Sequence, residues 1–169
     1  NSFASLPLAQ SLFKEALASD PEFIDAKLAL ARNYQLMGLT GIINTDDALQ
    51  QALPLIEQVL DTDPGNYLAR ALKLHRELGI NDKFIPEERR RKYQELRNLL
   101  PLLPNGSFLR DTVANYLSFV QVRNQEAIEV VQAGLLIDPL DANLHDTLGT
   151  TLRRMNRYDE AMVSFQRAL

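Results

Sequence analysis

Apolar side chains recur along the chain in a pattern that predicts pairs of α-helices. In one set of segments an apolar residue is followed three positions later by a second apolar or small residue and then by Leu, so that the three share one helical face. A proline four residues beyond that Leu ends the helix, because it lacks an N–H and clashes with the preceding turn. The copies are Phe13-Ala16-Leu17-Pro21, Ile56-Val59-Leu60-Pro64, Leu96-Leu99-Leu100-Pro104 and Val131-Gly134-Leu135-Pro139.

A second set of segments has the same periodicity and lies between these copies and after the last of them. Apolar or small residues recur three or four positions apart in segments 24–36, 65–79, 107–122 and 142–155. Gly149 lies on such a face, where a small residue lets two helices approach closely, and Gly38 is expected to stop the first helix of this set. The pattern therefore predicts an all-α chain of alternating first and second helices.

The C-terminal segment is the most regular copy and resembles a known repeat. Asn156-Arg157-Tyr158-Asp159-Glu160-Ala161 leads into Phe165, Ala168 and Leu169, with Leu148-Gly149 and Leu152 one helix earlier. This sequence resembles a tetratricopeptide repeat (TPR), a helix pair of about 34 residues. Since one pair cannot bury its apolar face alone, the resemblance implies a right-handed α-α superhelix of tetratricopeptide-like helix pairs.

The prolines that end the second helices are 43, 40 and 35 residues apart. They predict one repeat domain over 1–169 with units of approximately 1–21, 22–64, 65–104, 105–139 and 140–169. The long intervals place extra residues at 38–45 and 79–86, where Gly, Asn, Asp and Pro favour loops. The chain begins in an expected second helix and stops four residues short of the next expected proline, so we interpret it as a fragment of a longer protein. Alternatively, neighbouring repeats or another copy of the chain complete the register.

Composition places the chain among soluble globular proteins, with 46% apolar and 24% charged residues. No stretch approaches the roughly 18 consecutive apolar residues of a membrane span. The chain has no Cys, which excludes disulfides and thiolate metal sites within it and fits either the cytoplasm or an oxidising compartment such as the periplasm. We expect a soluble domain without membrane contact and leave the compartment open.

The sequence offers no recognisable catalytic or metal-binding motif. The two histidines, His75 and His145, are 70 residues apart and lack acidic partners at a known ligand spacing. His75 falls on an apolar helix face, where a packed, hydrogen-bonded histidine is the expected role, and His145 is expected to pack near the start of its helix. No nucleophile elbow or Gly-rich phosphate loop is present. We predict that this segment is not an enzyme and needs no cofactor or metal, although a parent chain could carry a catalytic domain elsewhere.

The net charge of −4 is unevenly distributed along the chain. Segment 70–97 holds nine basic and five acidic side chains, and its densest part is the run Arg89-Arg90-Arg91-Lys92. We favour a solvated helix face with pairs such as Glu87 with Arg91, over a site for an acidic peptide, a phosphate or nucleic acid. Nucleic acid is the least favoured ligand, because the chain is acidic and no aromatic residues are interleaved with the basic run.

In the family that the chain resembles, the first helix of each pair lines a concave groove. Residues offset by one or two positions from the packing face are expected to point into it. The candidate groove residues are Asp25, Leu28, Arg32, Gln35, Ala69, Lys73, Arg76, Asp111, Asn115, Ser118, Asn143, Asp146, Thr150 and Arg153.

The resemblance implies a non-catalytic protein-interaction or scaffold module whose groove binds an extended or helical peptide. Some family members clamp a partner's C-terminal carboxylate with Lys and Asn, but the matching places here carry Leu28 and Arg32. That kind of tail binding is therefore not expected, and the partner stays unidentified. The alternatives are an ordinary solvated surface and self-association through the repeat ends.

A weaker resemblance covers about the first 80 residues. Leu12-Phe13-Lys14-Glu15-Ala16-Leu17 with Asp20-Pro21, and Leu30-Ala31-Arg32-Asn33-Tyr34, are similar to the C-terminal repeats of bacterial regulators linked to a winged helix or a nucleotide cyclase. It implies, as the alternative function, a small-molecule-sensing or regulatory domain. Pro54 lies inside a predicted helix, so we expect a bend near it with the 38–45 loop packed beside it, an arrangement that could form a pocket.

Overall fold

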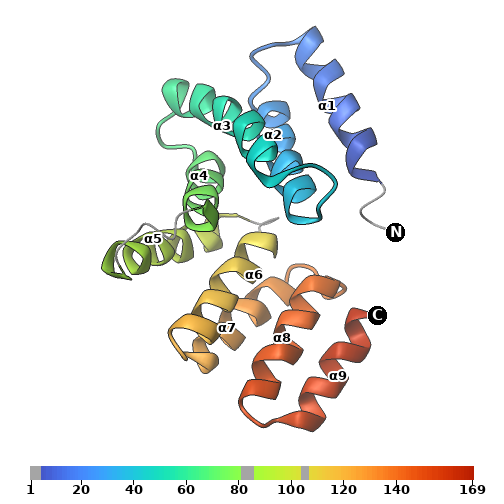
Figure 1. Cartoon of the computed structure of the whole chain (residues 1–169), viewed down its shortest axis with the longest axis vertical. Helices are drawn as coiled ribbons and strands as arrows, with labels where there is room; N and C mark the ends of the chain where they lie inside the picture. Colours follow the sequence, from blue (N-terminus) through green and yellow to red (C-terminus); the bar gives the residue numbers. More distant parts are fainter. Residues whose placement is uncertain (1–4, 81–85, 104–106) are drawn as a thin grey trace. The chain divides into compact units, whose positions relative to one another are not determined.

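The computed structural model describes residues 5–80, 86–103 and 107–169, and these residues contain helices but no strand. Figure 1 shows the helices in chain order. They are α1 (Leu6–Ser19), α2 (Ile24–Leu39), α3 (Thr45–Thr62), α4 (Tyr67–Ile80), α5 (Pro86–Leu99), α6 (Ser107–Asn115), α7 (Asn124–Leu135), α8 (Ala142–Arg154) and α9 (Tyr158–Ala168), with a 3₁₀ turn η2 (Leu100–Leu102) and a π-helical segment η3 (Tyr116–Val120). The chain divides into two compact units, unit 1 (Asn1–Asn81) and unit 2 (Asp82–Leu169).

The all-α prediction is confirmed, and every predicted helical segment coincides with a helix. The expected stop at Gly38 is wrong, because α2 continues to Leu39 and the positive φ of 71° occurs at Gly41. The second set of extra residues, 79–86, lies largely outside the described residues. The boundary between the two units separates α4 from α5, which the proline spacing assigns to one pair, and the division into five repeats stays a prediction.

In unit 1, α2 packs between α1 and α3 (Figure 1). The α2–α3 crossing is close because a Cβ at Gly38 would lie only 2.8 Å from the Cβ of Ala48. Helix α3 begins at the cap residue Asn44, whose Oδ1 accepts from the Asp46 N–H at 2.8 Å. Ala31, Ala52 and Ile56 are fully buried, so small and branched residues fill the space between the helices.

In unit 2, α8 packs against α6, α7 and α9. A Cβ at Gly149 would lie 2.6 Å from Cε1 of Phe165, which confirms that Gly149 permits the close approach of α8 and α9. Arg110 is a buried cation on α6 whose guanidinium donates to the main-chain carbonyls of Leu100 at 2.9 Å and Leu103 at 3.1 Å. These two bonds attach the segment that follows α5 to α6.

Candidate functional site

Gln35 joins α2 to α4, the predicted first helices of neighbouring pairs. Its Nε2 donates to the main-chain carbonyl of Leu72 at 3.1 Å, and its side chain is buried. Its Oε1 is also buried and has no hydrogen-bond partner among the described residues. Leaving a buried acceptor unsatisfied costs about 1–3 kcal/mol.

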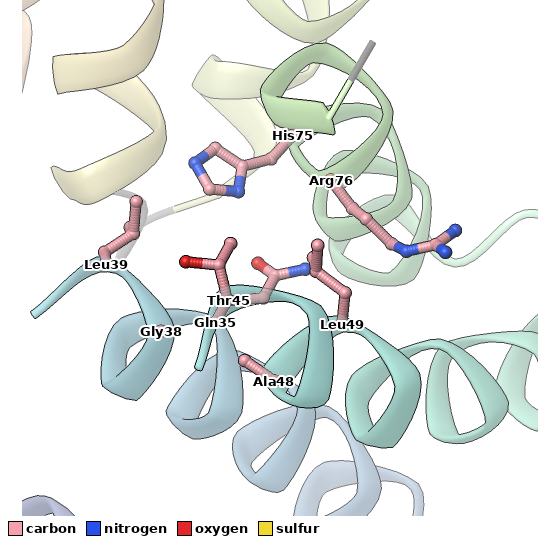
Figure 2. Close-up of a pocket in the computed structure, with 8 residues that line it drawn as sticks. All are labelled: Gln35, Gly38, Leu39, Thr45, Ala48, Leu49, His75 and Arg76. Carbon is pink, nitrogen blue, oxygen red and sulfur yellow. The ribbon is translucent and has the colours of Figure 1, made fainter. Parts of the chain in front are cut away.

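A pocket surrounds this amide. Figure 2 shows the Gln35 amide and the Thr45 hydroxyl on one side and the His75 ring across from them, while the Arg76 guanidinium points away. The cavity volume is about 80 Å³. We call it the Gln35 pocket, and its lining residues are Gln35, Gly38, Leu39, Thr45, Ala48, Leu49, His75 and Arg76.

The polar groups of the Gln35 pocket are largely neutral. Burial lowers the pKa of His75 from 6.5 to about 4, so its imidazole carries no charge at pH 7. His75 is partly buried, as a packed histidine would be, but it also lines the cavity. The Nε of Arg76 is a buried donor without a partner among the described residues. Neither this nitrogen nor Oε1 of Gln35 is open to solvent.

The hypothesis of a pocket beside the 38–45 loop is confirmed in its location, since Gly38, Leu39 and Thr45 belong to the lining. Pro54 is not part of the lining, and α3 runs through it from Thr45 to Thr62. The insertion after α2, rather than the proline, therefore shapes this site.

In unit 2, Asp111 on α6 bonds to α8. The Thr147 hydroxyl donates to Oδ1 of Asp111, and Asn115 Nδ2 donates to the same oxygen at 2.9 Å. Burial raises the pKa of Asp111, the two hydrogen bonds lower it, and the carboxylates of Asp146 and Asp141 raise it, so that the net shift is upward. The fold thus holds a carboxylate at an electrostatic cost that a partner's cationic side chain would offset.

The other candidate groove residues differ in exposure. Asp25, Asn143, Asp146 and Arg153 are exposed, and Arg32, Lys73, Asn115 and Thr150 are partly buried.

Three of the candidates are closed off inside the structure. Leu28, Ala69 and Ser118 are 3%, 0% and 0% exposed, and the Ser118 hydroxyl donates to Asn124 Oδ1 at 2.9 Å. A partner cannot contact side chains that other residues of the chain cover. Leu28, Ala69 and Ser118 are therefore not part of the proposed binding surface.

Part of the basic charge of segment 70–97 is neutralised internally. Arg97 on α5 pairs with Glu126 on α7 at 2.6 Å, and Arg123 pairs with the same carboxylate. The arginine hydrogen bonds lower the pKa of Glu126. Nearby, the rings of Tyr93 and Tyr116 stack with centroids 3.5 Å apart.

Sequence reasoning missed Thr147 and the α3 residues of the Gln35 pocket. Thr147 follows Asn143 by four positions, so helical spacing from that candidate leads to it. Thr45 and Leu49 are also four apart, but they lie on a second helix, which the groove argument did not consider. The feature of the sequence that pointed to these two residues was the adjacent loop, 38–45.

Comparisons with solved structures give the fold an independent reference. The crystal structure of TTC0263, a thermophilic TPR protein in Thermus thermophilus, is 16% identical in sequence to this chain and superimposes on it with a TM-score of 0.67. The match covers 99% of this chain and 84% of the TTC0263 chain. A crystal structure of MamA has a TM-score of 0.56 and 16% identity, with coverage of 98% and 87%, and MamA AMB-1 has a TM-score of 0.53 and 19% identity, with coverage of 98% and 88%.

At the sequence level, no family model and no curated protein matches the chain. No helix in the described parts of the chain combines the length and apolarity needed to cross a membrane. The helical pairing, the close crossings at glycine and the likeness to TTC0263 agree with one another. This chain has the fold of tetratricopeptide-repeat proteins.

Proposed function

We propose that the chain is a non-catalytic protein-interaction module that binds a segment of a partner protein along the first helices of its pairs. Fold alone does not define function, so the proposal depends on the residues that those helices carry. The observation that carries it is Asp111, whose carboxylate is held between α6 and α8 by Thr147 and Asn115 although burial opposes its charge. Such a group is suited to a cationic partner.

The surroundings of Asp111 favour a partner segment with Lys or Arg. Asp146 and Asp141 act on the same carboxylate, and the field of the three together is negative. Complementary charge mainly provides specificity and faster association, whereas affinity comes from a few well-buried contacts. The segment therefore needs an apolar anchor in addition to its cation.

The second candidate is a small-molecule-sensing domain of a larger regulator, and the Gln35 pocket is the observation in its favour. Its volume of about 80 Å³ is small. Sites for small molecules usually have about 300–1,000 Å³. The size of the cavity thus favours the interaction module.

Asp111→Asn tests the proposal. Peptides selected from a random displayed library should be enriched in Lys and Arg, and the variant should bind them about tenfold more weakly, the loss of one charge-assisted contact of about 1.4 kcal/mol. Isothermal titration calorimetry gives both affinities.

The same substitution should stabilise the fold. Because the folded-state pKa of Asp111 is raised, its ionised form at pH 7 opposes folding, and Asn removes that charge while its Oδ1 still accepts a hydrogen bond. Urea unfolding at pH 7 should therefore show a higher free energy of unfolding for the variant than for the natural chain. Asp159→Asn, on an exposed position of α9, is the matched control. Unchanged peptide affinity in Asp111→Asn, or a library that yields no binders, would count against the proposal.

A further inference from the structure

We propose that a hollow lined by three arginines in unit 2 binds a phosphate group. It lies between α5, η3 and the turn that precedes α7, and we call it the arginine hollow. The lining residues that the argument uses first are Arg90, Tyr93, Arg97, Tyr116, Gln121 and Arg123. Asp111 is not part of this lining, so the inference goes beyond the proposed function and does not depend on it.

The charge of the arginine hollow is unbalanced. Arg90, Arg97 and Arg123 line it, and none of the described residues in the lining is Asp or Glu. Glu126 pairs with Arg97 and Arg123, so three positive charges and one negative charge leave +2. A phosphate monoester carries about −1.5 to −2 at pH 7, which matches this charge more closely than a carboxylate does.

The guanidinium groups of Arg97 and Arg123 are oriented but not saturated. Nη1 of Arg97 donates to Oε2 of Glu126 at 2.6 Å, and Nε and Nη2 of Arg123 donate to the same carboxylate. Each guanidinium has further N–H groups, and these have no partner in the part of the chain that the structure describes. Glu126 therefore holds two forks in place and leaves donors for a second anion, and such forks bind phosphate oxygens in pairs.

Two tyrosines add neutral donors. The Tyr116 hydroxyl accepts from Nε2 of Gln121 at 2.9 Å, which leaves its own proton available to a ligand. Burial raises the pKa of Tyr93 against the opposing charge of Arg89, so this hydroxyl also keeps its proton at pH 7. The stacking of the two rings fixes this wall of the hollow.

The hollow has an apolar floor and an open mouth. Val113, Tyr116 and Leu117 are buried, whereas Arg90 and Arg123 are exposed. Charges beside such a floor interact more strongly than charges in bulk water. The cavity volume is about 20 Å³. A single water needs about 10–15 Å³, so the space admits the terminal oxygens of one phosphate and leaves the rest of a ligand in the mouth.

The probes are inorganic phosphate and N-acetyl-O-phospho-L-serinamide, titrated at an ionic strength held constant with NaCl. In ¹H–¹⁵N spectra of the full chain, both should shift the Nε–Hε resonances of Arg90, Arg97 and Arg123, with a dissociation constant of about 1 mM or lower. Tighter binding of inorganic phosphate identifies a site for the free anion. Tighter binding of the serine compound identifies a site for a phosphorylated side chain.

Arg90→Gln removes the arginine that has no ion pair within the described ranges. It should weaken phosphate binding about tenfold, through the loss of one charge-assisted contact. The unfolding midpoint should not change, because the side chain is exposed. Arg91→Gln is the matched control, since it makes the same change of charge on an exposed position of α5 outside the lining, and it should bind almost as the natural chain does.

Glu126→Gln removes the carboxylate that competes for the arginines. It should strengthen phosphate binding severalfold, because the charge of the group increases by one unit. Glu129→Gln makes the same change on an exposed position of α7 outside the lining and should have little effect. If the unfolding midpoint of Glu126→Gln falls, the comparison of Arg90→Gln with Arg91→Gln decides.

Two results overturn the inference. Equal weakening by Arg90→Gln and Arg91→Gln would show that phosphate responds only to the net charge of α5. Arginine shifts no larger with phosphate than with chloride would show that no phosphate site exists. Neither result bears on peptide binding that depends on Asp111.

Discussion

At the scale of single residues, the informative side chains are polar groups whose environment does not suit them. Gln35 has an acceptor unmet among the described residues, Asp111 has a raised pKa, and His75 has a lowered one. Sequence reasoning placed Gln35 and Asp111 among the groove candidates from helical offset alone. It could not separate the partly buried Asp111 from the buried Gln35, Leu28 and Ser118, because burial depends on side chains that other helices bring near.

His75 makes stability depend on pH. Its pKa falls from 6.5 to about 4 on folding, so the unfolded chain binds more protons between these values and the free energy of unfolding decreases as the pH falls through that window. The loss attributable to His75 between pH 7 and pH 4 should reach about 3 kcal/mol. Urea unfolding at pH 7, 5.5 and 4 measures it.

The comparison with His75→Gln isolates this residue from the carboxylates, which titrate in both proteins. The variant should lose less stability on acidification than the natural chain. Parallel losses in the natural chain and His75→Gln would show that His75 does not titrate as described.

At the scale of helices, glycine sets the closest crossings. Gly149 could be predicted because it lies on the apolar face of a regular repeat, opposite a helix whose position the family defines. The close crossing at Gly38 could not be predicted, because a glycine near a helix end is equally consistent with a helix stop. Its contact with Ala48 also depends on the path that the chain takes after the loop.

The π-helical segment η3 was also missed. Apolar periodicity over 107–122 predicts one continuous helix, and nothing in the spacing marks the wider turn at Tyr116–Val120. The stacking of Tyr116 on Tyr93 lies at the start of this segment, and it involves residues that are 23 positions apart in the sequence.

Gly149→Ala should destabilise the α8–α9 pair. The added methyl would lie 2.6–2.9 Å from three atoms of the Phe165 ring. Overpacking of this kind costs about 1–3 kcal/mol, against roughly 1 kcal/mol gained from the higher helix propensity of Ala. We expect a net loss of up to about 2 kcal/mol in urea unfolding. In a Phe165→Leu background the added loss should be smaller, and a strictly additive double variant would argue against the clash.

At the scale of the whole chain, the periodic pattern predicted the class of fold but not its division into two units. The boundary falls between α4, which packs on α2 and α3, and α5, whose buried residues are Leu96 and Leu99. Proline spacing carries no information on how strongly two helices adhere.

The division predicts local rather than uniform responses to damage. In hydrogen exchange, Gly149→Ala should reduce protection in α8, α9 and the adjoining α7 and leave α2 and α3 unchanged, because repeat units are stabilised mainly by their neighbours. Equal loss of protection in α2 and α8 would indicate that the chain unfolds as one cooperative body.

Arg110 has a consequence for how the sequence can vary. Its guanidinium binds the carbonyls of Leu100 and Leu103, which are main-chain groups that every residue possesses. Substitutions of surface side chains on α5 therefore leave this attachment intact. The basic run Arg89-Arg90-Arg91-Lys92 lies on α5 and takes no part in these two hydrogen bonds. Its charges can therefore change without weakening the connection to α6 that Arg110 makes.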